Sequence, residues 1–419
     1  MSNPRTITGY GKISLLLATA LALLATPMVS PAMHDIATHF KGQMESDPSG
    51  RFLVSLLSFT TDTVSIRYLI KFILLSTPAL MIVLCSPFMG WASDIWGRRK
   101  LLIAALFLFA FSGMSGYFAS TLTELFIGRL FLGMSIAAIK TLTVAMVGDY
   151  FTGKERDRFI GWQGSAMKFG GVLFLLLGGY LADIHWRIPF WGYALAFLAL
   201  PGAIFSLYDP KKPDATTPSS ASKAIALPIS IPKVGFILIS AFMASVLFFM
   251  TLVQIPFFIP ERFAGSPGEV GFAIALANLA GAGIAVLFYR FKERLSFVTI
   301  FTLIFALMGL GYWLVSVTPN YPLLLAAMTI AGCGFGLIVP TQSAWMLSEV
   351  TGARRGFGIG LVTTAMFLGQ FASPVLIEPF IDPEDPSSVF ETAGIILFGL
   401  SITYAIISFF QKSKRDIAS

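Results

Sequence analysis

The stretch Gly90-Trp91-Ala92-Ser93-Asp94-Ile95-Trp96-Gly97-Arg98-Arg99-Lys100 lies between two long apolar runs. Neither run, Phe72 to Met89 or Leu101 to Ala119, contains a charged residue, and each is long enough to cross a bilayer. Short loops rich in Lys and Arg collect on the cytoplasmic side of a membrane. The sequence therefore predicts two membrane-spanning helices joined by a cytoplasmic loop.

The composition agrees with a membrane protein. Hydrophobic residues make up 56% of the 419 residues, charged residues only 12%, and the mean hydropathy is +0.78. A soluble domain carries about 25% charged residues. The net charge of +7 comes from Lys and Arg in short loops, so it reflects membrane orientation and predicts no nucleic-acid partner. Cys85 and Cys333 both fall in apolar runs, where we expect packing residues and no disulfide.

Apolar segments of spanning length predict twelve helices. An even number places both termini on one side, and most of the 29 Lys and Arg residues then share that side, which predicts cytoplasmic termini. The first run is longer than a signal-peptide core, so we expect a retained helix. The predicted helices lie near 12–33, 67–92, 101–119, 122–148, 160–182, 190–207, 235–259, 270–290, 297–317, 321–347, 357–380 and 391–411.

A polar segment divides the chain in the middle. Residues 209–232 are rich in Pro, Ser, Thr and Lys, which is typical of a flexible linker. We therefore expect an N-terminal six-helix half at 1–208, a cytoplasmic linker at 209–232 and a C-terminal six-helix half at 233–419.

The pattern Gly-x-x-x-Asp-x-x-Gly-Arg-Arg after the second helix resembles the loop signature of the major facilitator superfamily, whose members are twelve-helix secondary transporters. The resemblance implies an all-α membrane protein of two pseudo-symmetric six-helix halves. It also implies a cytoplasmic gate in which the aspartate caps a helix of the other half, which begins near Gly356, and the first arginine pairs with an acid at the end of helix 4. The gating residues are Gly90, Asp94, Gly97, Arg98, Arg99 and Asp149.

Three further stretches bear on this resemblance. Gly128 to Gly133 resembles the Arg-x-x-x-Gly signature of helix 4, in which the family's arginine, here Arg129, is linked to proton transfer. Phe174 to Gly179 keeps only the final glycines of the Gly-Pro-x-x-Gly-Gly pattern that is typical of drug:proton antiporters. The stretch from Gly356 to Pro374 resembles bacterial efflux-type members.

The most distinctive chemistry is a set of cations inside the predicted helices. Lys140 and Lys168 each lie about ten residues from a cytoplasmic helix end, which places them ~15 Å deep. Arg129 shares a helix face with Lys140, because about three full turns separate them. No Asp or Glu is predicted at this depth. Since a mid-membrane lysine needs a partner or water, we expect either an anionic substrate or hydrogen bonds to backbone carbonyls.

Weaker polar candidates complete the predicted site. His34 and Asp35, at the outer end of helix 1, form a candidate proton relay. His34 and His39 do not share a helix face, and we expect no metal site and no cofactor. Four amides line the substrate path or hydrogen-bond between helices: Gln254, Asn278, Gln342 and Gln370.

The outer segment from Phe40 to Ser65 is long for this architecture. Its apolar part, Phe52 to Leu57, is too short to span a bilayer. Two interpretations stay open here: a short interfacial helix, or a lid over the outer mouth.

These observations favour a secondary transporter of the inner membrane. We expect a monomer in the lipid bilayer that exports a small organic anion or an amphipathic metabolite, such as a siderophore or a drug, with protons as the coupling ion. The alternative within transport is an antiporter that exchanges cationic or neutral drugs for protons. Alternatives of another class are a transport-dead sensor, which would need an output domain beyond these short tails, and a membrane-embedded enzyme, for which no convergent catalytic set is evident.

Overall fold

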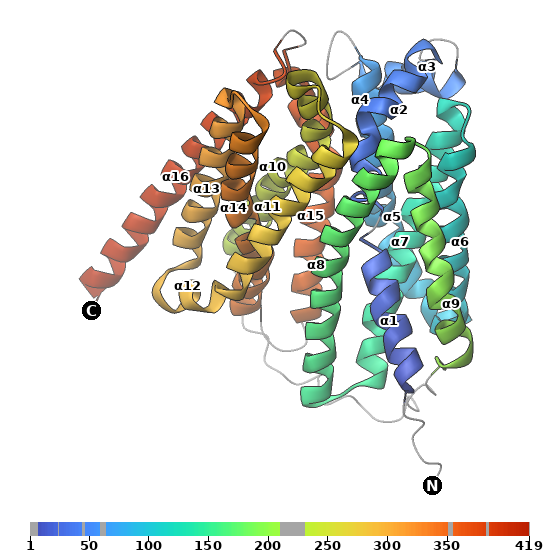
Figure 1. The fold of residues 1–419 in the computed structure, drawn as a ribbon. Helices are drawn as coiled ribbons and strands as arrows, with labels where there is room; N and C mark the ends of the chain where they lie inside the picture. Colours follow the sequence, from blue (N-terminus) through green and yellow to red (C-terminus); the bar gives the residue numbers. More distant parts are fainter. Residues whose placement is uncertain are drawn as a thin grey trace. The chain divides into compact units, whose positions relative to one another are not determined.

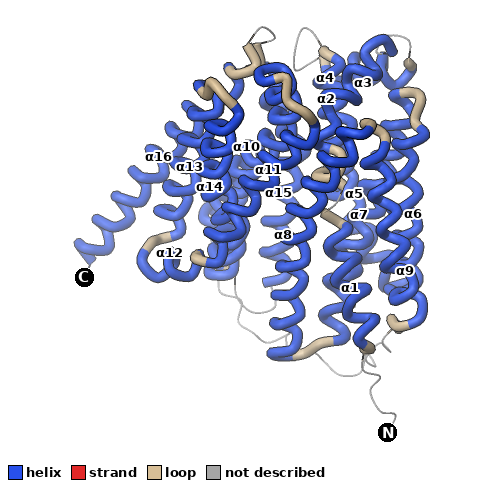
Figure 2. The backbone as a smooth tube through the Cα atoms, viewed as in Figure 1, coloured by secondary structure: helices blue, strands red, loops and turns tan. Residues whose placement is uncertain are grey.

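The computed structural model describes residues 7–23, 25–43, 47–58, 64–209, 231–350, 355–382 and 385–418, in which every regular element is a helix (Figure 2). The chain divides into two compact units, Met1–Pro218 and Ser219–Ser419 (Figure 1). The predicted linker at 209–232 contains this division, and its residues 210–230 lie outside the described part.

The first unit consists of long helices with short 3-10, π and α segments between them. Its long helices begin and end as follows: α1 (Gly9–Leu21), α5 (Thr77–Trp96), α6 (Arg98–Phe118), α7 (Leu122–Tyr150), α8 (Gly153–Ile184) and α9 (Ala196–Phe205). Its shorter elements are η1 (Ser30–Ala32), α2 (Met33–Phe40), η2 (Lys41–Gln43), α3 (Pro48–Leu57), α4 (Ile66–Lys71), the π-helical η3 (Phe72–Ser76) and η4 (Ile188–Leu195).

The second unit has fewer interruptions. Its elements are α10 (Ile231–Phe263), α11 (Pro267–Val286), α12 (Phe288–Arg294), α13 (Phe297–Val317), α14 (Tyr321–Glu349), α15 (Arg355–Ile377), η7 (Glu378–Phe380) and α16 (Ser388–Ala418).

The two units repeat one packing scheme. In the first, α7 packs against α5 and α6, and α8 packs against α1. In the second, α14 packs against α11 and α13, and α15 packs against α10. The helices that correspond in chain order therefore make corresponding contacts, which is the internal repeat expected of two six-helix halves.

Eleven helical stretches in the described residues are long and apolar enough to cross a membrane, and the shorter α1 is a twelfth apolar helix. The structure differs from the prediction at this first helix. The segment 12–33 is not continuous: α1 ends at Leu21, and α2 continues from Met33 to Phe40 after the η1 turn. Pro27 and Pro31 lie in the interruption, and proline cannot donate the backbone hydrogen bond that a continuous helix needs.

The charged stretch at 90–100 is also not a loop of several residues. Helix α5 continues to Trp96 and α6 begins at Arg98, so Gly97 alone joins them. Gly97 has a φ of 89°, a conformation that glycine adopts without the steric cost of a side chain.

The segment 40–65, which the sequence predicted to lie on the outer side, contains one short α-helix in its described part, α3. Leu53 and Leu57 are buried, whereas Phe52 is 59% exposed. Asp47, just before α3, accepts a 2.7 Å hydrogen bond from the hydroxyl of Thr123 in the first turn of α7. This bond anchors the start of α3 to the end of a spanning helix.

Candidate functional site

The turn at Gly97 brings the arginines of the signature to the ends of two other helices. Arg98 forms an ion pair with Asp149 and donates a 3.0 Å hydrogen bond to the carbonyl of Ala145, both near the end of α7. The sequence predicted this pairing partner, and the structure brings the two residues together.

Arg99 makes contacts that the sequence analysis missed. Its guanidinium donates to the carbonyls of Ala203, at 3.4 Å, and Ile204 at the end of α9. Its backbone N–H donates to Asp209 Oδ1 at 2.8 Å. A cation is favourable at the carbonyl end of a helix, so Arg99 caps α9. Asp209 had been assigned to the linker, and the sequence offered no signal for this contact.

The other two signature residues lie in α5. Gly90 lies beside α7, since a Cβ added there would be 3.9 Å from Thr141 Cγ2. Asp94 belongs to the last turns of α5, but its side chain lies outside the described part of the structure. Its role as a cap for a helix of the other half, near Gly356, remains a prediction.

Arg129 is the largest fully buried side chain, with 1% of its surface exposed. Its Nη1 donates to the hydroxyl of Tyr193 at 2.9 Å, and its guanidinium lies 4.9 Å from the centre of the Phe190 ring. The Tyr193 hydroxyl in turn donates to the carbonyl of Ala25 at 2.6 Å. Within the described part, Nε and Nη2 of Arg129 have no hydrogen-bond partner. The arginine therefore belongs to the core of the first unit, where its charge is held by two aromatic rings of η4.

Lys140 and Lys168 lie well inside the spans of α7 and α8. Lys140 is partly buried, and Lys168 is exposed on the surface of the first unit. Among the described residues, no Asp or Glu lies at comparable depth in a spanning helix.

Lys168 belongs to a face of α8 that the first unit leaves uncovered. Gly161, Gly164 and Lys168 are all exposed and recur at intervals that place them on one side of the helix. The opposite side packs against α1, where Gln163 donates to the hydroxyl of Thr19 at 2.9 Å. The strip formed by Gly161, Gly164 and Lys168 is therefore small and polar, which is unfavourable against lipid, while Phe169 beside it is 73% exposed.

Helix α15 has a similar face in the second unit. Gly360, Thr363 and Thr364 are exposed, whereas Gly369 and Ser373 pack against α10. Since α15 corresponds to α8 in chain order, both units have one helix with small and polar residues on its uncovered side.

The predicted amides of the second unit are mostly buried. Gln254 and Gln370 are 5% exposed and Gln342 is fully buried. In the described part, the amide nitrogen of Gln254 and both polar atoms of Gln342 have no hydrogen-bond partner. Asn278 donates to the carbonyl of Ile274 in its own helix at 2.8 Å. Buried amides without partners are costly, so these positions are suited to bind water or a polar solute group.

The three histidines of the chain, His34, His39 and His185, gather near the C-terminal end of α8. Burial raises the pKa of the Asp35 carboxyl, His34 and His185 oppose this shift, and the charge of Asp183 adds to it.

His39 and His185 both contact Trp186. The ring of His39 lies 4.8 Å from that of Trp186, and His185 stacks on it at 5.8 Å. Burial, together with the charges of Arg187 and His185, lowers the pKa of His39. No group of three potential metal ligands is close enough for a metal site among the described residues. The sequence pointed to His34 and Asp35 but missed Asp183 and His185, because only the fold brings the end of α8 to α2.

Two units of membrane-length helices with one repeated packing scheme define a multi-pass membrane protein of the secondary-transporter class. The sequence pattern of the Major Facilitator Superfamily matches residues 15–374. The chain belongs to this superfamily of transporters, as the signature at 90–99 predicted.

Known relatives support the assignment. Multidrug resistance protein 1 of Bacillus subtilis is 25% identical over 338 residues, which cover 78% of this chain and 84% of that protein. The quinolone resistance protein NorA of Staphylococcus aureus is 24% identical over 348 residues, covering 79% and 85%. A solved structure of a mutant of the peptide transporter POT in complex with alafosfalin shares the fold with a TM-score of 0.72, at 14% identity over 95% of this chain and 94% of that one.

Proposed function

We propose that this transporter exports amphipathic organic solutes that bear a carboxylate or another anionic group, by alternating access in the cytoplasmic membrane of a bacterium. The single observation that carries the proposal is the presence of Lys168 inside the span of α8, on a face that the first unit leaves uncovered. Both termini lie in the cytoplasm, the protein works as a monomer, and protons are the coupling ion.

Lys168 carries a positive charge within a membrane span. A lysine at this depth costs several kcal/mol unless it meets a counter-charge, polar groups or water. The described spans offer no carboxylate at that depth. An anionic solute that lies against the uncovered face of α8 supplies the charge only while it is bound. Charge pairing of this kind makes the site selective for anions.

The relatives suggest the size and character of the solute. One is named for multidrug resistance and the other for quinolone resistance. Quinolone antibiotics are flat, amphipathic and carry a carboxylate, so they combine a drug-like shape with a negative charge that complements Lys168. A quinolone carboxylate is therefore the probe of choice.

A second candidate is the exchange of cationic or neutral drugs for protons. The name of the multidrug resistance relative favours it, and the Asp35 cluster offers a group that binds protons outside the spanning helices. The absence of a mid-membrane carboxylate from the described spans argues against it, because a lipophilic cation would meet two lysines there.

The test is solute accumulation in everted membrane vesicles, with and without a proton gradient. We expect a fluoroquinolone to accumulate when the gradient is present and to leak out after a protonophore is added. The amphipathic cation ethidium should accumulate much less. Accumulation of ethidium alone would favour the second candidate, and accumulation of neither would contradict export of drug-like solutes.

A further inference from the structure

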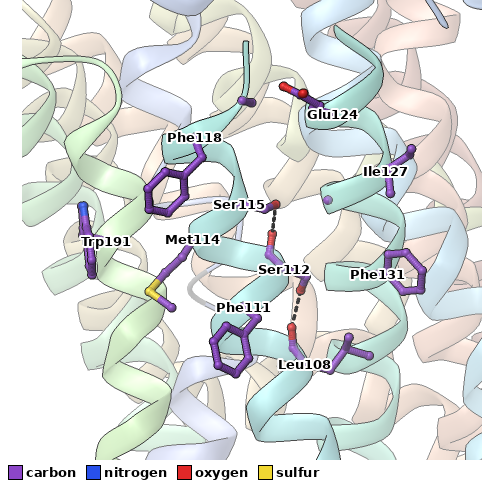
Figure 3. A pocket seen from close by; sticks show the side chains of 12 residues that line it. Leu108, Phe111, Ser112, Met114, Ser115, Phe118, Glu124, Ile127, Phe131 and Trp191 are labelled. Carbon is purple, nitrogen blue, oxygen red and sulfur yellow. Dashed lines mark hydrogen bonds between the residues drawn. The ribbon is translucent and has the colours of Figure 1, made fainter. Parts of the chain in front are cut away.

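An open apolar groove lies within the first unit, on α6, α7 and η4 (Figure 3). Its volume of about 800 Å³ falls in the range of sites for drug-sized ligands. Its lining consists mainly of aromatic and aliphatic side chains, among them Phe111, Phe118, Ile127, Phe131 and Trp191. These side chains are well exposed, Phe111 to 60% and Trp191 to 49%, so the groove is open to the surrounding medium.

The polar groups in the floor are already satisfied. The hydroxyl of Ser112 donates to the carbonyl of Leu108 at 2.5 Å, and that of Ser115 donates to the carbonyl of Ser112 at 2.8 Å (Figure 3). A Cβ on Gly128 would lie 2.3 Å from Ser115 Oγ, so only glycine lets α7 approach α6 this closely. The groove therefore presents a hydrocarbon surface, because the hydroxyl hydrogens of its two serines are already used in hydrogen bonds to backbone carbonyls.

The length of the groove matches one leaflet of a bilayer. It extends from Phe118, the last residue of α6, to Leu108. Ten helical residues rise about 15 Å, which is half of the ~30 Å hydrocarbon core. A straight acyl chain of one leaflet fits this dimension.

The end of the groove at Phe118 carries two opposite charges. Glu124 lines it and is the N3 residue of a capping box, in which its Oε2 accepts from the backbone N–H of Ser120 at 2.6 Å. Arg187 donates from Nη2 to the carbonyl of Ala119, which also lines the groove, at 3.2 Å. A carboxylate and a guanidinium at one end of a hydrocarbon groove complement an ammonium and a phosphate.

We propose that this groove binds one phospholipid with an ammonium headgroup, of the phosphatidylethanolamine type. The acyl chain lies against the aromatic lining, the ammonium pairs with Glu124 and the phosphate with Arg187. In the orientation proposed above, the lipid belongs to the outer leaflet. The inference concerns a surface of the first unit alone and does not depend on which solute is transported.

The test uses fluorescence quenching by lipids brominated in the middle of the acyl chain. The chain has seven tryptophans, so the signal of Trp191 is the difference between wild type and Trp191→Phe. Trp313, 43% exposed in the spanning helix α13, is the matched reference through Trp313→Phe. Brominated phosphatidylethanolamine in a phosphatidylglycerol bilayer is compared with the reverse mixture.

We expect the fluorescence of Trp191 to be quenched about three times more strongly by brominated phosphatidylethanolamine than by brominated phosphatidylglycerol, which is the size of a partly exposed ion pair. The fluorescence of Trp313 should be quenched equally by both lipids. Glu124→Gln keeps the capping box, because glutamine serves at N3, but should abolish the preference. Glu269→Gln, at N3 of a capping box of the same type in α11, is the control and should leave this headgroup preference intact.

The proposal is overturned if Trp191 and Trp313 show the same headgroup preference, which is the behaviour of ordinary bilayer lipid. It is also overturned if Glu124→Gln and Glu269→Gln behave alike. The comparison of the two tryptophans needs no change in the charged residues, so it decides the matter even if Glu124→Gln folds poorly. Arg187→Gln should weaken quenching by both lipids, because both carry a phosphate.

Discussion

At the scale of single residues, the turn at Gly97 holds together the ends of α5, α6, α7 and α9. Its positive φ lets α6 begin at once, which brings Arg98 to Asp149 and Arg99 to Asp209. The family signature thus has a structural purpose that is separate from membrane orientation. Each of its contacts can be removed by one substitution.

Gly97→Ala should lower the stability of the protein. A Cβ there would lie 2.9 Å from Asp209 Oδ2, and the φ of 89° is strained for alanine, so we expect a loss of about 1–3 kcal/mol. The measurement is the apparent Tm in detergent. Gly235→Ala in α10, where no atom lies within 4 Å of the added Cβ, is the control and should be neutral or slightly stabilising. Equal effects of the two substitutions would contradict the role of Gly97.

Arg98 and Asp149 should behave as a coupled pair. Reversing either charge alone leaves two like charges at the end of α7, so Arg98→Asp and Asp149→Arg should each slow transport and lower the Tm. The double reversal should recover part of both losses, with a coupling of about 1 kcal/mol because the side chains are only one-quarter exposed. Strictly additive losses would mean that the ion pair contributes nothing.

At the scale of elements, several titratable side chains gather where α2 meets the end of α8. Asp35 meets Asp183 and His185 from α8 and the turn after it, while α4, which also packs against α2, carries Arg67 and Lys71. The burial of Asp35 disfavours its ionised form.

Asp35 should make stability depend on pH. Because its pKa in the folded protein is raised above the ordinary value of 3.8, the folded state binds more protons than the unfolded state in the interval above 3.8. The contribution of Asp35 to the stability of the folded state is therefore fully present below pH 3.8, and it is lost as the pH rises through the pKa that Asp35 has in the folded protein. We expect Asp35→Asn to raise the Tm at pH 7 and to matter little near pH 4. A Tm difference between variant and wild type that is the same at both pH values would contradict this assignment.

The elements also show what the sequence could and could not predict. Apolar runs predicted the spans well, because burial in lipid requires about twenty apolar residues regardless of tertiary contacts. The ends of helices were less predictable. Helix α8 begins at Gly153, since a charged first turn does not interrupt a helix, whereas the first predicted helix is broken near Pro27 and Pro31.

The residues of the candidate site were likewise predictable only in part. The signature supplied Arg98 and its partner, and the charge pattern singled out Lys140, Lys168 and Arg129. The partners of Arg129 and Arg99, namely Tyr193 and Asp209, come from segments far along the chain and carry no motif. Contacts of this kind depend on how helices pack, and one sequence without its fold does not reveal them.

At the scale of the whole molecule, the two units repeat one packing scheme but differ in the polar side chains within their spans. The first unit contains the cations Arg129, Lys140 and Lys168, whereas the second contains the buried amides Gln254, Gln342 and Gln370. We therefore assign recognition of the solute's charge to the first unit, and hydrogen bonding to its uncharged part to the second.

The most direct test of this account measures the binding of a fluoroquinolone and of its methyl ester to the purified transporter. The ester differs from the acid by the loss of the negative charge and the addition of one methyl group. Lys168→Met and Lys140→Met should lower the affinity for the acid on the order of a hundredfold, because a desolvated ion pair is worth several kcal/mol. The affinity for the ester should change little. Lys168→Arg should keep part of the affinity. Lys154→Met, in the exposed first turn of the same helix, is the matched control and should change neither affinity. Unchanged affinity for the acid in both Met variants, or equal losses for acid and ester, would contradict the proposal that these lysines bind the anionic group of the solute.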